Sequence, residues 1–171
     1  RKLKTMVVFK GSATGRIAAA FRHGDVPTNA VECRVQPKAW CDQEVMTSWI
    51  NTVLGEYSSR FPNAGLLLID AFKVHQTAVT ARAVAAAGMH LEFIPAGYTS
   101  QLQVLDVAVN KPFKQFIREA YNLWLSGQIE RHGAAFNGRP DRSAVTLWVE
   151  AAWDRIDVDT IVNGWRKVGV N

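Results

Sequence analysis

A strand-helix-strand pattern in the middle of the chain constrains its fold more than any other feature. The apolar run Leu66–Ile69 is unbroken and ends at Asp70, which is typical of a strand covered on both faces of a sheet. The Ala-rich segment Ala78–Ala87 predicts a helix that stops at Gly88, and Leu91–Pro95 predicts the next strand. This order of elements predicts a right-handed crossover that joins two parallel strands.

The segments before this unit predict two more strands. Met6–Phe9 is a short apolar run closed by a turn, and Val31–Val35 alternates with period two, as a strand at or near a sheet edge does. The polar stretch Ser12–Asn29 between them predicts a loop with a short helix at Ile17–Phe21.

Amphipathic helices are expected in three places. Asp42 predicts the N-cap of a helix that reaches Tyr57, and a last helix is expected at Ser143–Ile156. The helix that follows Lys111 carries apolar residues on one face and Lys111, Lys114 and Arg118 on the other. The fold class is therefore α/β.

Composition and charge limit the class of protein. Hydrophobic residues make up 48% and charged residues 20%, which argues against disorder. No apolar run approaches the roughly 18 residues of a membrane span. The net charge of +5 permits a nucleic-acid partner but does not require one. Cys33 and Cys41 are too few for a disulfide framework or a zinc cluster, so we expect two reduced thiols in an intracellular protein.

Two acids lie where a metal site can form. Asp70 ends a strand, and sites in open α/β sheets form beyond the carboxyl ends of strands, although an Asp that begins a turn is the simpler interpretation. Thirty-five residues separate Asp70 from Asp106, which follows one crossover and a polar loop from Tyr98. Two carboxylates held together repel unless a cation joins them, and Mg²⁺ or Mn²⁺ prefers such oxygen ligands. A pair of these metals can clamp the attacking and leaving oxygens of a phosphoryl displacement.

These segments resemble a known family. LLLIDAFKVH (Leu66–His75) and IPAGYTSQLQVLDVAVNKPFK (Ile94–Lys114) are similar to the second and third catalytic motifs of the pogo/Tigger/jerky type of DDE superfamily transposases. Leu3–Gly11, the segment Gln36–Trp40 and the tail Val145–Trp165 also resemble parts of that domain. The sequence departs from the family at Ala71, Val104 and Ala108, which lie beside the two acids.

The resemblance implies a ribonuclease-H-like mixed sheet flanked by helices, with three acids and two divalent metals (Mg²⁺ or Mn²⁺) that cut and join DNA in the nucleus. Asp70 matches the second acid and Asp106 the third. The first acid sits upstream in the family, and the chain starts at Arg1 without an initiator Met, so we expect a fragment that lacks the first strand. Residues 1–126 are expected to be the partial catalytic domain and residues 127–171 its helical C-terminal extension.

Other polar residues near the acids have two interpretations each. His75 is expected either to support the metal-binding acids or to touch a DNA phosphate, and the alternative is a capping or packing histidine. Lys73, Lys111, Lys114 and Arg118 form either a DNA-binding stripe or a solvated face. Thr99 and Ser100 are expected to be turn hydroxyls, because no nucleophile elbow surrounds them.

Two functions therefore stay open. The first is a metal-dependent DNA endonuclease or transposase catalytic domain, a possible homo-oligomer that binds transposon ends and target DNA. The second is a domesticated or decayed relic that binds nucleic acid or protein without cleavage. A small-molecule hydrolase that uses Asp70 and His75 would need a nucleophile that the sequence does not offer.

Overall fold

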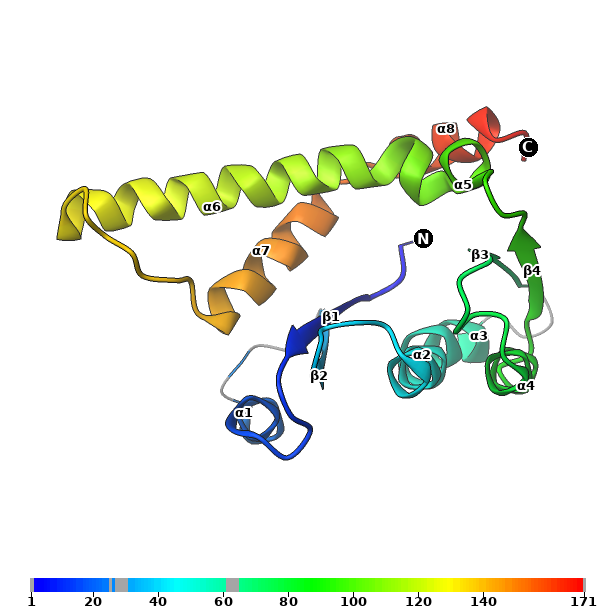
Figure 1. Cartoon of the computed structure of the whole chain (residues 1–171). Helices are drawn as coiled ribbons and strands as arrows, with labels where there is room; N and C mark the ends of the chain where they lie inside the picture. Colours follow the sequence, from blue (N-terminus) through cyan, green and yellow to red (C-terminus); the bar gives the residue numbers. More distant parts are fainter. Residues whose placement is uncertain (1, 25, 27–30, 61–64, 171) are drawn as a thin grey trace.

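The computed structural model describes residues 2–24, 26, 31–60 and 65–170 (Figure 1). Its strands are β1 Thr5–Lys10, β2 Val31–Gln36, β3 Leu66–Asp70 and β4 His90–Ile94. Its helices are α1 Arg16–His23, α2 Gln43–Trp49, α3 Gly55–Arg60, α4 Ala78–Ala86, α5 Thr99–Leu102, α6 Asn110–His132, α7 Arg142–Asp154 and α8 Val158–Lys167. Two π-helical turns, η1 Ile50–Leu54 and η2 Leu105–Val109, lie between helices. The α/β class predicted from the sequence is confirmed.

The strands form two parallel pairs. β1 pairs with β2 from Thr5 and Val31 onward, and β3 pairs with β4 so that Asp70 lies opposite Ile94. The predicted parallel β3-α4-β4 unit is confirmed, and Gly88 stops its helix in a left-handed conformation with a φ of 71°. Within the described residues the two pairs stay separate and every strand pairing is parallel, so a single mixed sheet is not observed.

β3 is less buried than its apolar sequence predicts. Leu66 is 58% exposed, and the other residues of the strand are half-buried. One side of β3 meets the core, where Leu67 and Ile69 pack. On the other side Leu66 and Leu68 line an open cavity of about 620 Å³ together with Val162 of α8. The prediction of a strand covered on both faces is therefore wrong here, because α8 stands off from the strand instead of packing against it.

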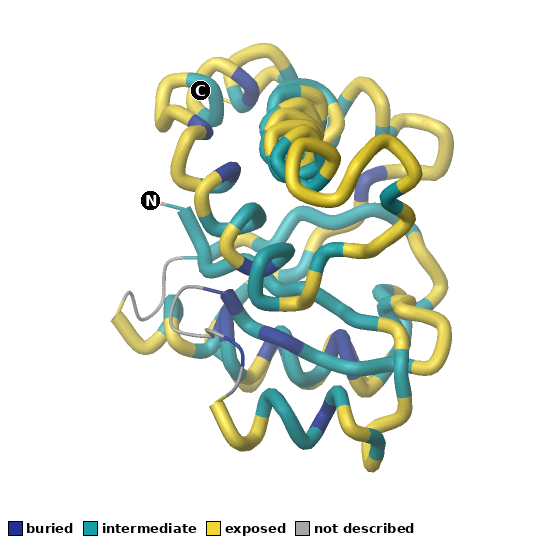
Figure 2. Tube along the Cα trace, turned by 90° about the vertical axis from the view of Figure 1, so that its left-hand side faces the viewer, coloured by how far each residue is buried: buried dark blue, intermediate teal, exposed yellow. Residues whose placement is uncertain are grey.

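The core beside β3 and β4 forms where α2 and η1 meet α4. Met46, Ile50, Leu54 and Val84 make up its buried cluster. Asp42 caps α2 as predicted, since its carboxylate accepts a hydrogen bond from the Val45 N–H at 3.0 Å. The buried residues of the strands are Val31 and Cys33 of β2 and Ile94 of β4, and the long helix α6 is exposed or half-buried throughout (Figure 2).

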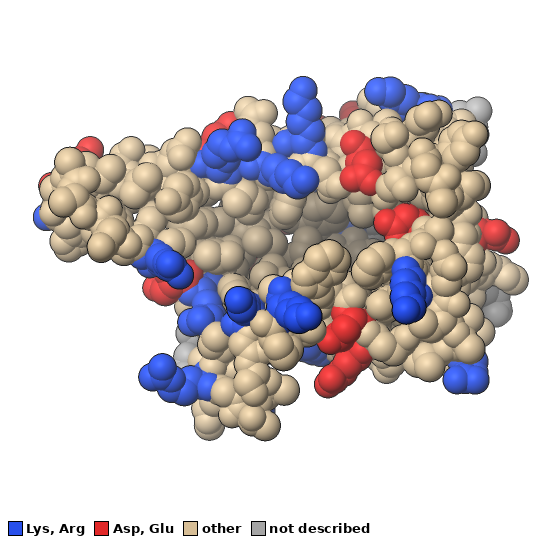
Figure 3. Space-filling model, in the orientation of Figure 1, with Lys and Arg blue, Asp and Glu red and all other residues tan. Residues whose placement is uncertain are grey.

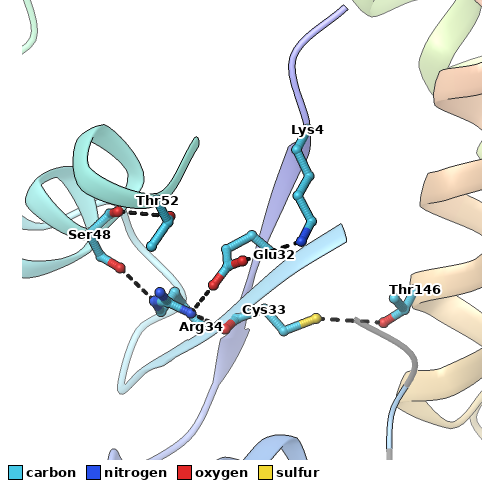
Figure 4. A network of polar contacts seen from close by, with 7 residues as sticks. All are labelled: Lys4, Glu32, Cys33, Arg34, Ser48, Thr52 and Thr146. Atoms are coloured by element: carbon cyan, nitrogen blue, oxygen red, sulfur yellow. Dashed lines mark hydrogen bonds and ion pairs between the residues drawn. The ribbon is translucent and has the colours of Figure 1, made fainter. Parts of the chain in front are cut away.

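A polar network ties β1 and β2 to the helices on either side (Figure 4). The Arg34 Nε donates to Ser48 Oγ at 2.6 Å, and Arg34 also pairs with Glu32, which lies 3.6 Å from the Lys4 Nζ. The buried Cys33 Sγ lies 3.9 Å from Thr146 Oγ1 of α7. These contacts hold α2 and α7 to β2.

The long helix begins earlier than the sequence predicts. Asp106 lies in η2, which continues directly into α6, so the prediction that Asp106 ends a polar loop is wrong. Pro112 has no N–H, so the Ala108 carbonyl lacks the α-helical hydrogen bond that residue 112 would otherwise donate. Ala108 lies in the π turn η2, which is consistent with this missing hydrogen bond. α8 packs closely against η2 at Gly164, where a larger residue would clash. A Cβ at this position would lie only 2.9 Å from the Ala108 Cβ and from Val104 Cγ1. α6 crosses residues 126 and 127, and the domain division expected there stays a prediction.

Candidate functional site

Asp70 leaves β3 into a short loop that folds back onto its own carboxylate. The Asp70 Oδ1 accepts a hydrogen bond from the Phe72 N–H at 3.2 Å and lies 2.7 Å from Nδ1 of His75. The same Nδ1 lies 3.1 Å from the Asp70 carbonyl oxygen. An ionised carboxylate and a carbonyl only accept hydrogen bonds, so Nδ1 is the donor to both. Within the described residues Oδ2 accepts no hydrogen bond, and it stays available to a ligand.

A half-buried hydroxyl network, with Thr80 at its buried end, supports this loop. Thr77 Oγ1 donates to the Gln43 side-chain oxygen at 2.6 Å, and the Gln43 Nε2 donates to Thr80 Oγ1 at 3.1 Å. Thr80 Oγ1 then donates to the Val74 carbonyl at 2.8 Å. Thr77 is also the N-cap of α4. This network was not predicted from the sequence, where its local signal is the N-cap spacing of Thr77 and Thr80.

Asp106 is exposed on η2. Its Oδ1 accepts a hydrogen bond from Asn110 Nδ2, one helical turn later, at 2.6 Å. η2 contacts α5, α6 and α8, so neighbouring helices set its position. Asn110 was not predicted as part of the site, although its spacing of four residues from Asp106 is the sequence signal for this contact.

The fold brings the elements that carry both acids to one region. β3 and β4 are parallel, so Asp70 ends at the edge from which β4 continues toward α5 and Asp106. Figure 1 shows β4 pointing toward α5 and the start of α6. In the part of the chain that the structure describes, however, no group of three or more His, Cys, Asp or Glu side chains could hold a metal ion.

The predicted basic residues are exposed. Lys73 lies in the loop after Asp70, and Lys111, Lys114 and Arg118 lie on α6. None of the four forms a hydrogen bond or an ion pair within the described residues. Figure 3 shows Lys and Arg side chains over α6 and along the opposite edge of a hollow in this face. The exposure fits both a DNA-binding stripe and a solvated face, so the assignment stays a prediction.

The comparison with known families decides the ancestry of this arrangement. Residues 1–165 match the family described as DDE superfamily endonuclease. The chain belongs to that family. This membership confirms the resemblance seen in the sequence, and it makes the chain a transposase-related domain.

Curated relatives of this DDE-family chain carry pogo names. It is 28% identical over 173 residues to "Pogo transposable element with KRAB domain" of Mus musculus and, equally, of Homo sapiens; these alignments cover 100% of this chain and 27% of each relative. A human "Pogo transposable element with ZNF domain" is 22% identical over 122 residues, or 70% of this chain and 8% of the relative. The chain thus spans about a quarter of the length of the first two relatives. No solved structure matches it.

Among the helices of the described residues, none combines the length and the apolar character needed to cross a bilayer.

Proposed function

We propose that this chain is part of a metal-dependent catalytic domain that hydrolyses and transfers DNA phosphodiester bonds. The observation that supports it is the setting of Asp70 within a family match that covers nearly the whole chain. Asp70 ends a strand, one of its oxygens is held by His75 and the other is available. Asp106 adds a second exposed carboxylate on the element that follows β4.

The donor chemistry of the two acids fits Mg²⁺ or Mn²⁺, because both ions prefer carboxylate oxygens. Asp70 would bind through Oδ2 and Asp106 through its carboxylate, and the first acid of the family motif would come from upstream of Arg1 in a longer protein. When bound, two such ions supply the positive charge that activates a water or a DNA 3′-hydroxyl and neutralises the phosphate. His75 orients Asp70 in this proposal.

The remaining parts of the proposal concern DNA and fold. Lys73, Lys111, Lys114 and Arg118 would contact backbone phosphates of transposon ends or target DNA, which position the duplex without reading its sequence. The fold would be ribonuclease-H-like, with a further strand that joins the β1–β2 and β3–β4 pairs into one mixed sheet. The protein would act in the nucleus, and as a homo-oligomer if two DNA ends are joined.

The test is DNA nicking by the protein extended to its full catalytic domain, measured on supercoiled plasmid with Mn²⁺ or Mg²⁺. Asp70→Asn and Asp106→Asn are each expected to abolish nicking while thermal unfolding stays close to that of the unchanged protein. Asp159→Asn is the matched control, because Asp159 is an exposed acid in the first turn of α8. Full activity in either of the first two variants would refute the site assignment.

A relic without catalysis is the second candidate. The observation that favours it is the departure of the sequence from the family pattern at Ala71, Val104 and Ala108, beside the two acids. If the extended protein without substitutions binds DNA but nicks it with neither metal, the domain is a relic that binds without cleavage.

A further inference from the structure

Two exposed aromatic rings lie next to the candidate acid, and the proposed chemistry does not use them. Trp40 is 61% exposed and Phe72 39%, and their rings stack with centroids 6.3 Å apart and an interplanar angle of 24°. Large aromatic side chains are usually buried, since each removes a large apolar area from water. An exposed stack of two is therefore a feature that needs an explanation.

The rings are connected to Asp70 through a short chain of contacts. Phe72 lies edge-on to His75, with ring centroids 5.5 Å apart. Its backbone N–H also donates to Asp70 Oδ1, the oxygen that His75 holds. A ligand that binds to Trp40 and Phe72 would therefore lie close to Asp70, separated from it by one or two side chains.

A tight turn between β2 and α2 presents Trp40. The Gln36 side-chain oxygen accepts from the Lys38 N–H at 2.6 Å and from the Trp40 N–H at 3.1 Å. Between them, Ala39 has a φ of 57°, the one positive φ of a residue other than glycine in the described part of the chain. A left-handed alanine costs about 1 kcal/mol or more, and such strain gathers at functional sites. The turn thus holds Trp40 outward at a cost to stability.

Positive charge flanks the stack. Lys38 precedes Trp40 by two residues and Lys73 follows Phe72 directly, and both are exposed. Aromatic surfaces with adjacent cations are the pattern by which proteins bind unpaired nucleotides, because the ring stacks on a base while the cation meets the backbone phosphate.

We propose that Trp40 and Phe72 form a stacking platform for an unpaired nucleobase. This base would lie in the DNA strand next to the phosphate on which the site of Asp70 acts. The inference rests on the proposed function for the class of ligand. It adds a site for a base that has left the duplex, either at a strand end or by flipping. Stacking there positions the strand for attack and carries little sequence preference, since every base has a π face.

The test uses the full-length protein without added divalent metal, so that cleavage does not interfere. The probes are a duplex with one unpaired 2-aminopurine and the same duplex with that base paired. Affinity is measured by fluorescence anisotropy and stacking by quenching of the 2-aminopurine. The variants are Trp40→Ala, Phe72→Ala and Trp40→Phe, with Leu123→Ala as the control because Leu123 is 78% exposed on α6.

We expect Trp40→Ala to bind the unpaired probe about 5- to 150-fold more weakly, the range that loss of one stacked base gives, and to lose the quenching. Trp40→Phe is expected to keep most of the affinity for the unpaired probe and most of the quenching, and Phe72→Ala to lose part of each. Leu123→Ala is expected to change neither the affinity nor the quenching. Binding of the paired probe stays constant in all four variants. If Trp40→Ala binds and quenches like the unchanged protein, or weakens both probes equally, the platform is refuted while DNA binding stands. If the unchanged protein binds neither probe, the proposed function fails together with it.

Discussion

The loop that carries Asp70 and His75 depends on one buried hydroxyl. Thr80 is fully buried, and its Oγ1 donates to the Val74 carbonyl at 2.8 Å while accepting from the Gln43 Nε2 at 3.1 Å. Thr80→Val keeps the size and branching of the side chain but removes both hydrogen bonds. The substitution therefore tests the polar network without opening a cavity.

The cost follows from the groups left unpaired. A buried polar group without a partner costs about 1–3 kcal/mol. The Val74 carbonyl loses its 2.8 Å bond from Thr80 and keeps only the longer contact with Thr77 Oγ1 at 3.2 Å, and half-buried Gln43 recovers part of its loss through water. The sum is about 2–4 kcal/mol, which for a chain of this length lowers Tm by about 4–16 °C.

The assay is urea unfolding followed by circular dichroism, with thermal unfolding as a second measurement. Thr80→Ser is the matched control, because it keeps the hydroxyl and loses one methyl group, at a cost of about 1 kcal/mol. Thr80→Val is expected to be the less stable of the two. If it is as stable as Thr80→Ser or more stable, the network does not hold the loop and the reasoning is wrong.

Two further outcomes check the core and the thiols. Ile50→Ala empties a fully buried position and is expected to cost about 2–5 kcal/mol in urea unfolding, whereas Leu123→Ala at an exposed position changes stability by less than about 0.5 kcal/mol; equal effects would place Ile50 outside the core. Burial raises the pKa of Cys33 and of Cys41 above the ordinary 9.0. As pH rises through about 9, the thiols of the unfolded chain ionise before those of the folded chain, which favours unfolding. The stability that the protonated thiols contribute below about pH 9 is therefore lost as pH rises. Tm measured from about pH 8 to about pH 10 is expected to fall more for the unchanged protein than for Cys33→Ala/Cys41→Ala; parallel curves would contradict the shifts.

Much of the secondary structure is visible in the sequence because its signals are local. Asp42 caps a helix through an N–H three residues away, and Gly88 ends one because it tolerates a left-handed conformation. The parallel β3-α4-β4 unit follows from the order of strand, helix and strand, which leaves few ways to pair the strands. The family is also visible, because its motifs are contiguous runs around Asp70 and Asp106.

The path of the chain after β4 shows a limit of local patterns. The polar residues after Tyr98 are typical of a loop, yet α5 and η2 form there and carry Asp106 on a helix. α8 packs Gly164 against Val104 and Ala108, and this contact between distant segments favours the helical path. No window of sequence around Asp106 contains that partner.

Local sequence patterns predict the α/β class, the central strand-helix-strand unit and the family whose motifs contain Asp70 and Asp106. The exposure of Leu66 beside a cavity, the hydrogen bond of Thr80 to the His75 loop and the stacking of Trp40 on Phe72 arise from the packing of segments that are distant in the sequence. The reason is physical: dihedral preferences and hydrogen bonds between near neighbours are encoded locally, whereas burial and side-chain contacts depend on which distant segments meet.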